Sequence, residues 1–322
     1  MIETRLTRRF GLEHPIFSAP MARAGGGALA AAVTRAGGLG LIGGGYGDVG
    51  WIEDQFAAAG NEAVGCGLIT WQLEGRPEVL DAVLAHQPRA VFLSFGDPLP
   101  YAAAIAEAGL PLICQVQTVA DARVAVAAGA QVIVAQGGEA GGHGARRGTL
   151  ALVPEVADML AVEAPDVVLL AAGGIADGRG LAAALMLGAD GVLMGTRFWA
   201  SCEALVHPGQ MAAGLAASGD GTLRTQVVDI ARGLDWPAPY DIRVLGNGFT
   251  DRWHDDPAGL RADAGARADW ADAWENGNAE LGNAIVGEGI GLIPTQMSAE
   301  EIVEQVVAQA EALLNEGWKR HV

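Results

Sequence analysis

The stretch Val132-Ile-Val-Ala-Gln-Gly-Gly-Glu-Ala-Gly-Gly-His-Gly144 joins a continuous apolar run to a glycine-rich segment. The run at 132–136 is typical of a parallel strand that is buried on both faces, because apolar side chains point to both sides of it. The glycines that follow carry no Cβ, so their backbone amides can approach a ligand closely. Apolar runs of this kind recur along the chain, several of them followed by glycine, and the fold is predicted from this repeat.

Eight apolar runs alternate with alanine-rich segments of helical length. The expected strands are 16–20, 39–43, 64–70, 90–95, 111–116, 132–136, 167–172 and 191–195. The expected helices are 28–36, 51–59, 77–85, 100–108, 119–128, 152–162 and 180–187, each bounded by glycine, proline or an acidic residue. A doubly wound open sheet is the alternative architecture. The number of repeats favours a (β/α)8 TIM barrel, which is an α/β fold.

The chain divides into three expected parts. Residues 1–217 hold the eight units of the barrel. Residues 218–297 hold four tryptophans amid Asp, Gly and Asn, which predicts an irregular cap or lid over the barrel mouth. A packing excursion without ligand contact fits the same composition. In residues 298–322, apolar side chains share one helical face and predict a final helix that packs back on the barrel.

Bulk composition excludes several classes of partner. A formal net charge of -18 repels nucleic acid and anionic membrane surfaces. The three cysteines are far apart, which indicates neither a disulfide framework nor a zinc site and fits a reducing compartment. No uninterrupted apolar run approaches the ~18 residues of a membrane span. We therefore expect a cytoplasmic protein with no nucleic acid or membrane partner, and a homodimer is left open.

Missing residue types exclude several chemistries. The only lysine is Lys319, near the end of the chain, so a barrel lysine for Schiff-base chemistry or pyridoxal phosphate is absent. His254-Asp-Asp256 is the nearest approach to a metal cluster, and its polar surroundings favour a solvated turn, so no metal is expected. No G-x-S-x-G motif supports a hydrolase triad.

Two glycine-rich strand ends predict a phosphate site. Barrel enzymes place their sites at the carboxyl ends of the strands, often with a phosphate after strands seven and eight. Here the seventh run ends at Ala172 before Gly173 and Gly174, and the eighth ends at Gly195 before Thr196. Backbone N–H groups at the start of the following helices favour an anion. Either pair alone fits a tight turn, whereas both together indicate a phosphate-bearing ligand.

Other strand ends supply groups for a flat ligand. The first run leads through Ala19 and Pro20 to Met21, which suits contact with an aromatic ring and also suits a core position. The amides of Gln115 and Gln136 can bind the polar edge of a heterocycle or cap nearby backbone.

His143 is the titratable side chain of the glycine-rich stretch. It follows Gly141 and Gly142 and precedes Gly144. An imidazole titrates near neutral pH, so His143 is a candidate general acid, general base or anion-binding cation. A histidine on a surface turn is the alternative.

Five segments together resemble the nitronate monooxygenases, also called 2-nitropropane dioxygenases. They are 15–21, 36–40, 136–144, 172–177 and 188–198, and segment 287–293 is similar more loosely. The resemblance implies FMN in the barrel, with His143 on the substrate side of the isoalloxazine ring and the phosphate on Gly173, Gly174, Gly195 and Thr196. The remaining implied cofactor contacts are Ala19, Pro20, Met21, Gly67, Gln115, Gln136, Gly141, Gly142 and Ala172. Gly67 stands where family members often have asparagine.

The implied activity is oxidation of alkyl nitronates or nitroalkanes with O2 to a carbonyl compound and nitrite. FMN-dependent NAD(P)H reductases of the enoyl-acyl-carrier-protein or quinone type share the glycine-glycine-histidine feature and are the main alternative. A flavin-binding sensor without turnover is a third. Barrels similar to inosine monophosphate dehydrogenase use a nucleophilic cysteine in the loop after a late strand. No cysteine lies between Cys114 and Cys202, which argues against that class.

Overall fold

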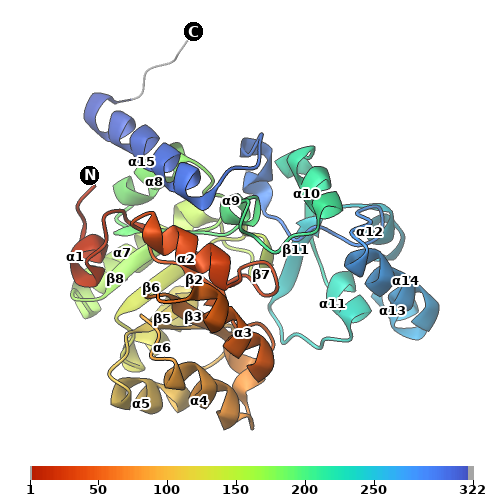
Figure 1. The fold of residues 1–322 in the computed structure, drawn as a ribbon, viewed down its shortest axis with the longest axis horizontal. Coiled ribbons are helices and arrows are strands. Elements are labelled where there is room, and N and C mark those ends of the chain that lie inside the picture. Colours follow the sequence, from red (N-terminus) through yellow and green to blue (C-terminus); the bar gives the residue numbers. More distant parts are fainter. Residues whose placement is uncertain (1, 318–322) are drawn as a thin grey trace.

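Eight parallel strands form the centre of the molecule in a computed structural model that describes residues 2–317 (Figure 1). In sheet order they are β1 (Ile16–Ser18), β9 (Gly191–Met194), β8 (Val168–Ala172), β6 (Val132–Gln136), β5 (Leu112–Val116), β4 (Val91–Ser94), β3 (Gly65–Ile69) and β2 (Leu41–Gly43). A parallel bridge between Phe17 and Leu39 joins the two outer strands and nearly closes the barrel. The predicted barrel is confirmed, and every predicted strand is present.

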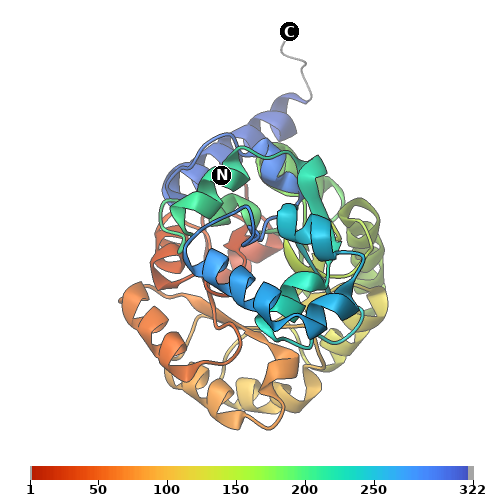
Figure 2. The same ribbon diagram turned by 90° about the vertical axis from the view of Figure 1, so that its right-hand side faces the viewer.

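Helices surround these strands as a ring (Figure 2). They are α2 (Gly27–Arg35), α3 (Val49–Ala59), α4 (Pro77–Ala85), α5 (Leu99–Glu107), α6 (Val119–Ala127), α7 (Thr149–Glu163), α8 (Gly178–Met186) and the short α9 (Thr196–Trp199), with a 3₁₀ turn at Thr70–Leu73. Asp48 and Thr118 begin α3 and α6 by accepting hydrogen bonds from backbone N–H groups of the first turn.

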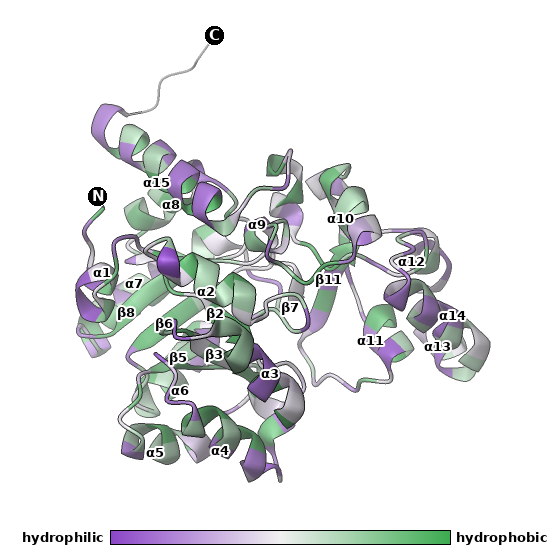
Figure 3. Cartoon of the chain, viewed as in Figure 1, coloured by the Kyte–Doolittle hydropathy of each residue, from purple (hydrophilic) through white to green (hydrophobic). Residues whose placement is uncertain are grey.

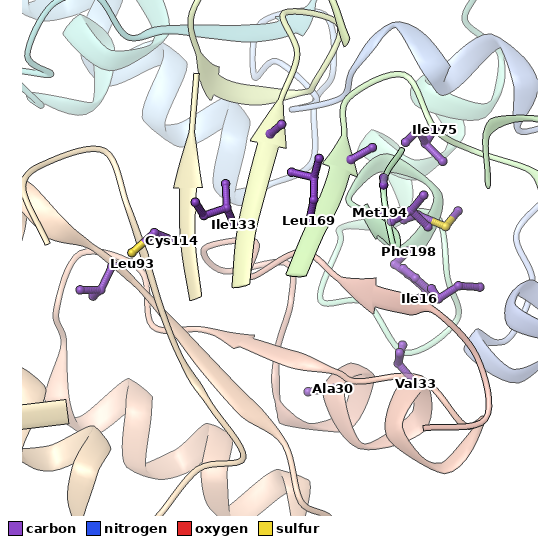
Figure 4. Packing of buried hydrophobic residues seen from close by; sticks show 14 of the residues in the cluster. Ile16, Ala30, Val33, Leu93, Cys114, Ile133, Leu169, Ile175, Met194 and Phe198 are labelled. Carbon is purple, nitrogen blue, oxygen red and sulfur yellow. The ribbon is translucent and has the colours of Figure 1, made fainter. Parts of the chain in front are cut away.

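The core has an inner and an outer layer because successive strand side chains point to opposite faces. In β6, Val132 and Val134 join Phe17 and Phe92 inside the barrel. The intervening Ile133 packs in the layer between strands and helices, with Leu169 of β8 and Val33 of α2 (Figure 4). Strand β8 is hydrophobic along its whole length, as Figure 3 shows. Burial on both faces explains the continuous apolar runs.

A short helix closes the amino-terminal end of the barrel. Helix α1 (Arg5–Phe10) places Leu6 and Phe10 in the inner layer. Arg5 donates to both carboxylate oxygens of Asp190, at 2.8 and 2.7 Å, immediately before β9. The sequence predicts no element here, because six residues are too few to show a helical period.

We call residues 218–297 the cap. It contains β10 (Thr222–Thr225), α11 (Val227–Arg232), β11 (Asp241–Leu245), α12 (Gly248–Trp253), α13 (Pro257–Ala262) and α14 (Ala264–Glu275), with 3₁₀ turns at Gly219–Gly221 and Glu288–Leu292. Its apolar side chains, among them Val244, Phe249 and Trp270, form a cluster of their own. In Figure 1 these elements lie on the side of the molecule opposite α1.

Two further helices complete the chain. Helix α10 (Pro208–Leu215) precedes the cap, and α15 (Ala299–Glu316) packs against α8 and α2. The predicted last segment runs to residue 322, and its final part, including Lys319, lies outside the described residues. The division of the chain at residues 217 and 297 stays a prediction. No helix in the described part of the chain is long and apolar enough to cross a membrane.

The glycine-rich stretch forms a strand of the cap sheet. Strand β7 (Gly142–Gly144) pairs antiparallel with β11, so that His143 lies opposite Ile242, and β11 pairs in turn with β10. The sequence predicts no strand at this position, since glycine is rare in strands.

Arg224 of β10 holds the glycine-rich stretch through its backbone. The guanidinium donates to the carbonyl oxygens of Gly138, Ala140, Gly142 and Gly144 at 3.0 to 3.4 Å. Burial, assisted by the charge of Arg243, lowers the pKa of Arg224 to about 10. A planar guanidinium with five N–H donors can bind several carbonyl oxygens at once. It can therefore hold a glycine-rich backbone, which has no side chains to pack.

We expect Arg224→Met to lower the free energy of unfolding by roughly 2–5 kcal/mol, because several buried carbonyl oxygens would lose their donor. Urea unfolding followed by circular dichroism measures the change. Arg8→Met is the control, since Arg8 is exposed and makes one surface ion pair with Glu3. Equal urea midpoints for both variants would contradict the assigned role of Arg224.

Candidate active site

A cavity of about 670 Å³ lies where the carboxyl ends of the barrel strands meet the cap. This size suits a small-molecule site. The structure brings all the residues predicted from the sequence into its lining, namely Ala19, Pro20, Met21, Gly67, Gln115, Gln136, Gly141, Gly142, His143, Ala172, Gly173, Gly174, Gly195 and Thr196. Their individual contacts with a cofactor stay predictions.

The backbone geometry after β8 requires glycine at positions 173 and 174. Their φ angles of 100° and 74° lie in the left-handed region that other residues rarely adopt. A Cβ on Gly173 would also lie 2.9 Å from the carbonyl oxygen of Gly137. The tight turn after β8 therefore accounts for this pair without a ligand.

Gly195 is different, because neither its backbone nor its protein neighbours require glycine. Its φ is -98°, and a Cβ would have only ordinary contacts, 3.6 Å from Ala19 Cβ and 3.9 Å from Met21 Sδ. That Cβ would occupy space beside the cavity lining. The absence of a side chain here fits close approach of a bound group.

Hydrogen-bond donors lie around the same place. Within residues 2–317, no partner is found for the backbone N–H groups of Gly174, Gly195 and Thr196. The Thr196 hydroxyl accepts a bond from Gly287 N at 2.9 Å and keeps its own proton to donate. These donors fit the phosphate of a cofactor.

The start of α8 departs from the expectation of an open anion site. The Asp177 side chain already accepts from the backbone N–H groups of Arg179 and Gly180. The protein's own carboxylate therefore occupies this helix terminus, and the donors come from the strand ends themselves.

Gln136 uses its amide to support the histidine. Its Oε1 accepts from Gln117 Nε2 at 2.9 Å, and its Nε2 donates to the His143 carbonyl oxygen at 3.1 Å. The alternative of backbone capping describes the bond to the His143 carbonyl oxygen, whereas the bond with Gln117 joins two side chains. Gln115 lines the cavity and is half-buried.

His143 is buried, with 8% of its surface exposed, and both of its main partners come from the cap. Its Nε2 lies 2.9 Å from Asp229 Oδ2, and the Trp236 indole stacks on its ring with 3.3 Å between centroids and 9° between planes. A carboxylate only accepts hydrogen bonds, so we assign the proton to Nε2, which leaves the lone pair of the neutral ring on Nδ1. A surface turn is excluded.

Burial lowers the pKa of His143 below its ordinary value. The hydrogen bond and the negative charge of Asp229 raise this pKa and offset part of the effect, and the charges of Arg232 and Arg224 lower it further. Desolvation dominates because it penalises the charged imidazolium. His143 is therefore mainly neutral at pH 7, and the neutral imidazole is the form that can accept a proton.

Phe95 shows backbone strain at the same site. It follows β4 with a φ of 62°, which is rare for a bulky residue. Its ring contacts the rings of His143 and Trp236 with centroid distances of 6.2 and 5.1 Å. Strain of this kind collects at functional sites, where surrounding contacts enforce it.

Asp229, Arg232 and Trp236 are site residues that no sequence motif singles out. One signal was available for Asp229, which interrupts the apolar run Val227-Val-Asp-Ile-Ala231, since a carboxylate at a buried helical position requires a partner. Trp236 was visible only as one of the four cap tryptophans.

Within the described residues, no group of three or more metal-ligating side chains is close enough to hold a metal ion. His254 and Asp255 lie between α12 and α13, where His254 Nδ1 is 3.1 Å from Thr225 Oγ1 and Asp256 caps α13.

Comparison with known proteins confirms the family resemblance. The model of the nitronate monooxygenase family matches residues 57–309. Nitronate monooxygenase npaC of Metarhizium robertsii is 38% identical over 93% of this chain and 91% of its own. FabK of Thermotoga maritima is 30% identical and superposes with a TM-score of 0.84 over 98% of both chains. Nitroalkane oxidase of Streptomyces ansochromogenes is 25% identical, with a TM-score of 0.80 over 97% of this chain and 99% of the other. On these matches, the chain belongs to the nitronate monooxygenase family of flavin-dependent oxidoreductases.

Proposed function

We propose that this protein is an FMN-dependent enzyme that oxidises alkyl nitronates or nitroalkanes with O2 to a carbonyl compound and nitrite. The observation that carries the proposal is a desolvated histidine, His143, on the same cavity as the glycine ends of β8 and β9. The relationship to nitronate monooxygenases along most of the chain supports the choice of substrate.

The FMN would be held by the barrel. Gly174, Gly195 and Thr196 offer donors to its phosphate, and the space beside Gly195 and Met21 admits it. When bound, the flavin accepts electrons from the substrate and passes them to O2.

His143 would act as the general base that removes the proton from the carbon next to the nitro group. With Nε2–H donated to Asp229, the Nδ1 lone pair can accept the proton of a neutral nitroalkane. Asp229 then stabilises the imidazolium that forms and keeps the ring oriented. Arg232, whose Nη1 lies 3.7 Å from Asp229 Oδ1, also lines the cavity and adds positive charge near the resulting nitronate.

A reductase is the second candidate. The similarity to FabK extends over 98% of both chains, and the family includes FabK enoyl reductases. A reductase would draw electrons from NADH or NADPH at this site in place of a nitronate.

The protein is expected to bind FMN noncovalently, and Gly195→Val is expected to weaken this binding at least tenfold by filling the space beside Met21. Titration of the flavin-free protein with FMN, followed by flavin fluorescence, measures the affinity. Urea unfolding of the flavin-free variant is the control and should change little, because a Cβ here meets only ordinary contacts and the φ of -98° does not require glycine. A protein that takes up no FMN refutes the cofactor assignment.

Anaerobic mixing with ethyl nitronate is expected to bleach the flavin absorption. NADH and NADPH are mixed in parallel under the same conditions. Rapid bleaching by a pyridine nucleotide, with no response to the nitronate, would establish the reductase instead. A flavin that responds to none of them would indicate the non-catalytic sensor.

Activity toward neutral nitroalkane is expected to rise with pH through the lowered pKa of His143, below its ordinary 6.5, and to stay level at pH 7 and above. The neutral imidazole is the competent base. Asp229→Asn removes the charge that raises this pKa, so the inflection should move to lower pH and the plateau should fall.

His143→Ala separates the two roles of the imidazole. We expect a loss of about 10²–10⁴-fold with nitroalkane and a much smaller loss with preformed nitronate, while the flavin stays bound. If the activity of the unmodified protein toward nitronate falls as pH rises through the pKa of His143, the imidazole would instead serve as an anion-binding cation.

A further inference from the structure

One aromatic side chain of the cap covers a face of the His143 imidazole. Trp236 lies in the connection 233–240 between α11 and β11, and its indole is parallel to the imidazole at a centroid distance of 3.3 Å. This is van der Waals contact, so no other planar group fits between the two rings.

The indole is fixed in this position from several sides. Its Nε1 donates to the Tyr46 hydroxyl at 3.2 Å. Trp71, Phe95 and Tyr240 meet it edge to face, with centroid distances of 5.4, 5.1 and 6.5 Å. Such contacts add to the energy of simple burial.

The position of Trp236 limits the shape of the cavity. His143, Trp236, Tyr46 and Phe95 all line it, so the wall nearest the imidazole is built from protein rings. A substrate with an aryl group needs space for its ring beside this wall, whereas a short alkyl chain is small enough to fit without that space.

We propose that Trp236 is a specificity-determining residue whose indole occupies the place where a planar substrate group would stack on His143, restricting the site to short alkyl nitronates. The choice of nitronates rests on the proposed function, whereas the filled stacking position rests on the observed geometry.

Removal of the indole is expected to leave the fold intact. Most of the connection around Trp236 is exposed, including Gly233, Asp235 and Pro237, so the barrel and cap cores do not depend on it. Trp71→Ala is the comparison variant, because it removes one of the rings that hold the Trp236 indole without removing a group that lines the cavity. Trp236→Phe serves as a milder second variant.

The first measurement compares kcat/KM for the nitronates of phenylnitromethane and nitroethane. We expect Trp236→Ala to raise the ratio of phenyl to ethyl substrate by about 10–200-fold, the range that hydrophobic pocket contacts supply. Trp236→Phe should raise it less. Trp71→Ala should also raise it less than Trp236→Ala does, because Tyr46, Phe95 and Tyr240 still hold the Trp236 indole over the imidazole. An unchanged ratio in Trp236→Ala overturns the inference.

The second measurement needs no turnover. Titration calorimetry with benzoate, a planar anion, is expected to show at least tenfold tighter binding to Trp236→Ala than to the unmodified protein. If this holds while no variant oxidises any nitronate, the stacking position stands and the proposed function fails. Equal benzoate affinities overturn the inference whatever the activity.

Discussion

The backbone pairing of His143 with Ile242 determines the geometry of the site. In a strand, a shift of one residue turns every side chain to the opposite face, so this register directs the imidazole toward Asp229 and Trp236. The flanking glycines contribute no side-chain packing that could fix the register. It depends instead on the ladder hydrogen bonds and on Arg224, which holds the carbonyl oxygens of the stretch.

The barrel and its glycine-lined mouth could be predicted because their signals are local. Each strand is an apolar run with both faces buried, and several runs end at a residue that now lines the cavity, as with Ala172 and Gly195. Helix α1 escaped because six residues carry no period, although Leu6 and Phe10 complete the inner core.

The surroundings of His143 could not be predicted in the same way. Asp229 is 86 residues away from it in the chain, and no spacing rule connects a buried carboxylate to an imidazole at that distance. No spacing rule predicts the stacking of Trp236 on His143 either. Strand β7 was hidden for another reason: its glycines have low strand propensity, and only the partner strand β11 gives them that structure.

The shared sheet also sets an order of events during biosynthesis. Strand β7 is synthesised with the barrel, whereas β11 follows on the order of ten seconds later at ordinary translation rates. Until then the glycine segment has no partner strand, and His143 has neither its carboxylate nor its indole. The nascent chain therefore contains the whole barrel before Asp229 and Trp236 are synthesised, so the surroundings of the His143 imidazole are completed later than the glycine-lined mouth of the barrel.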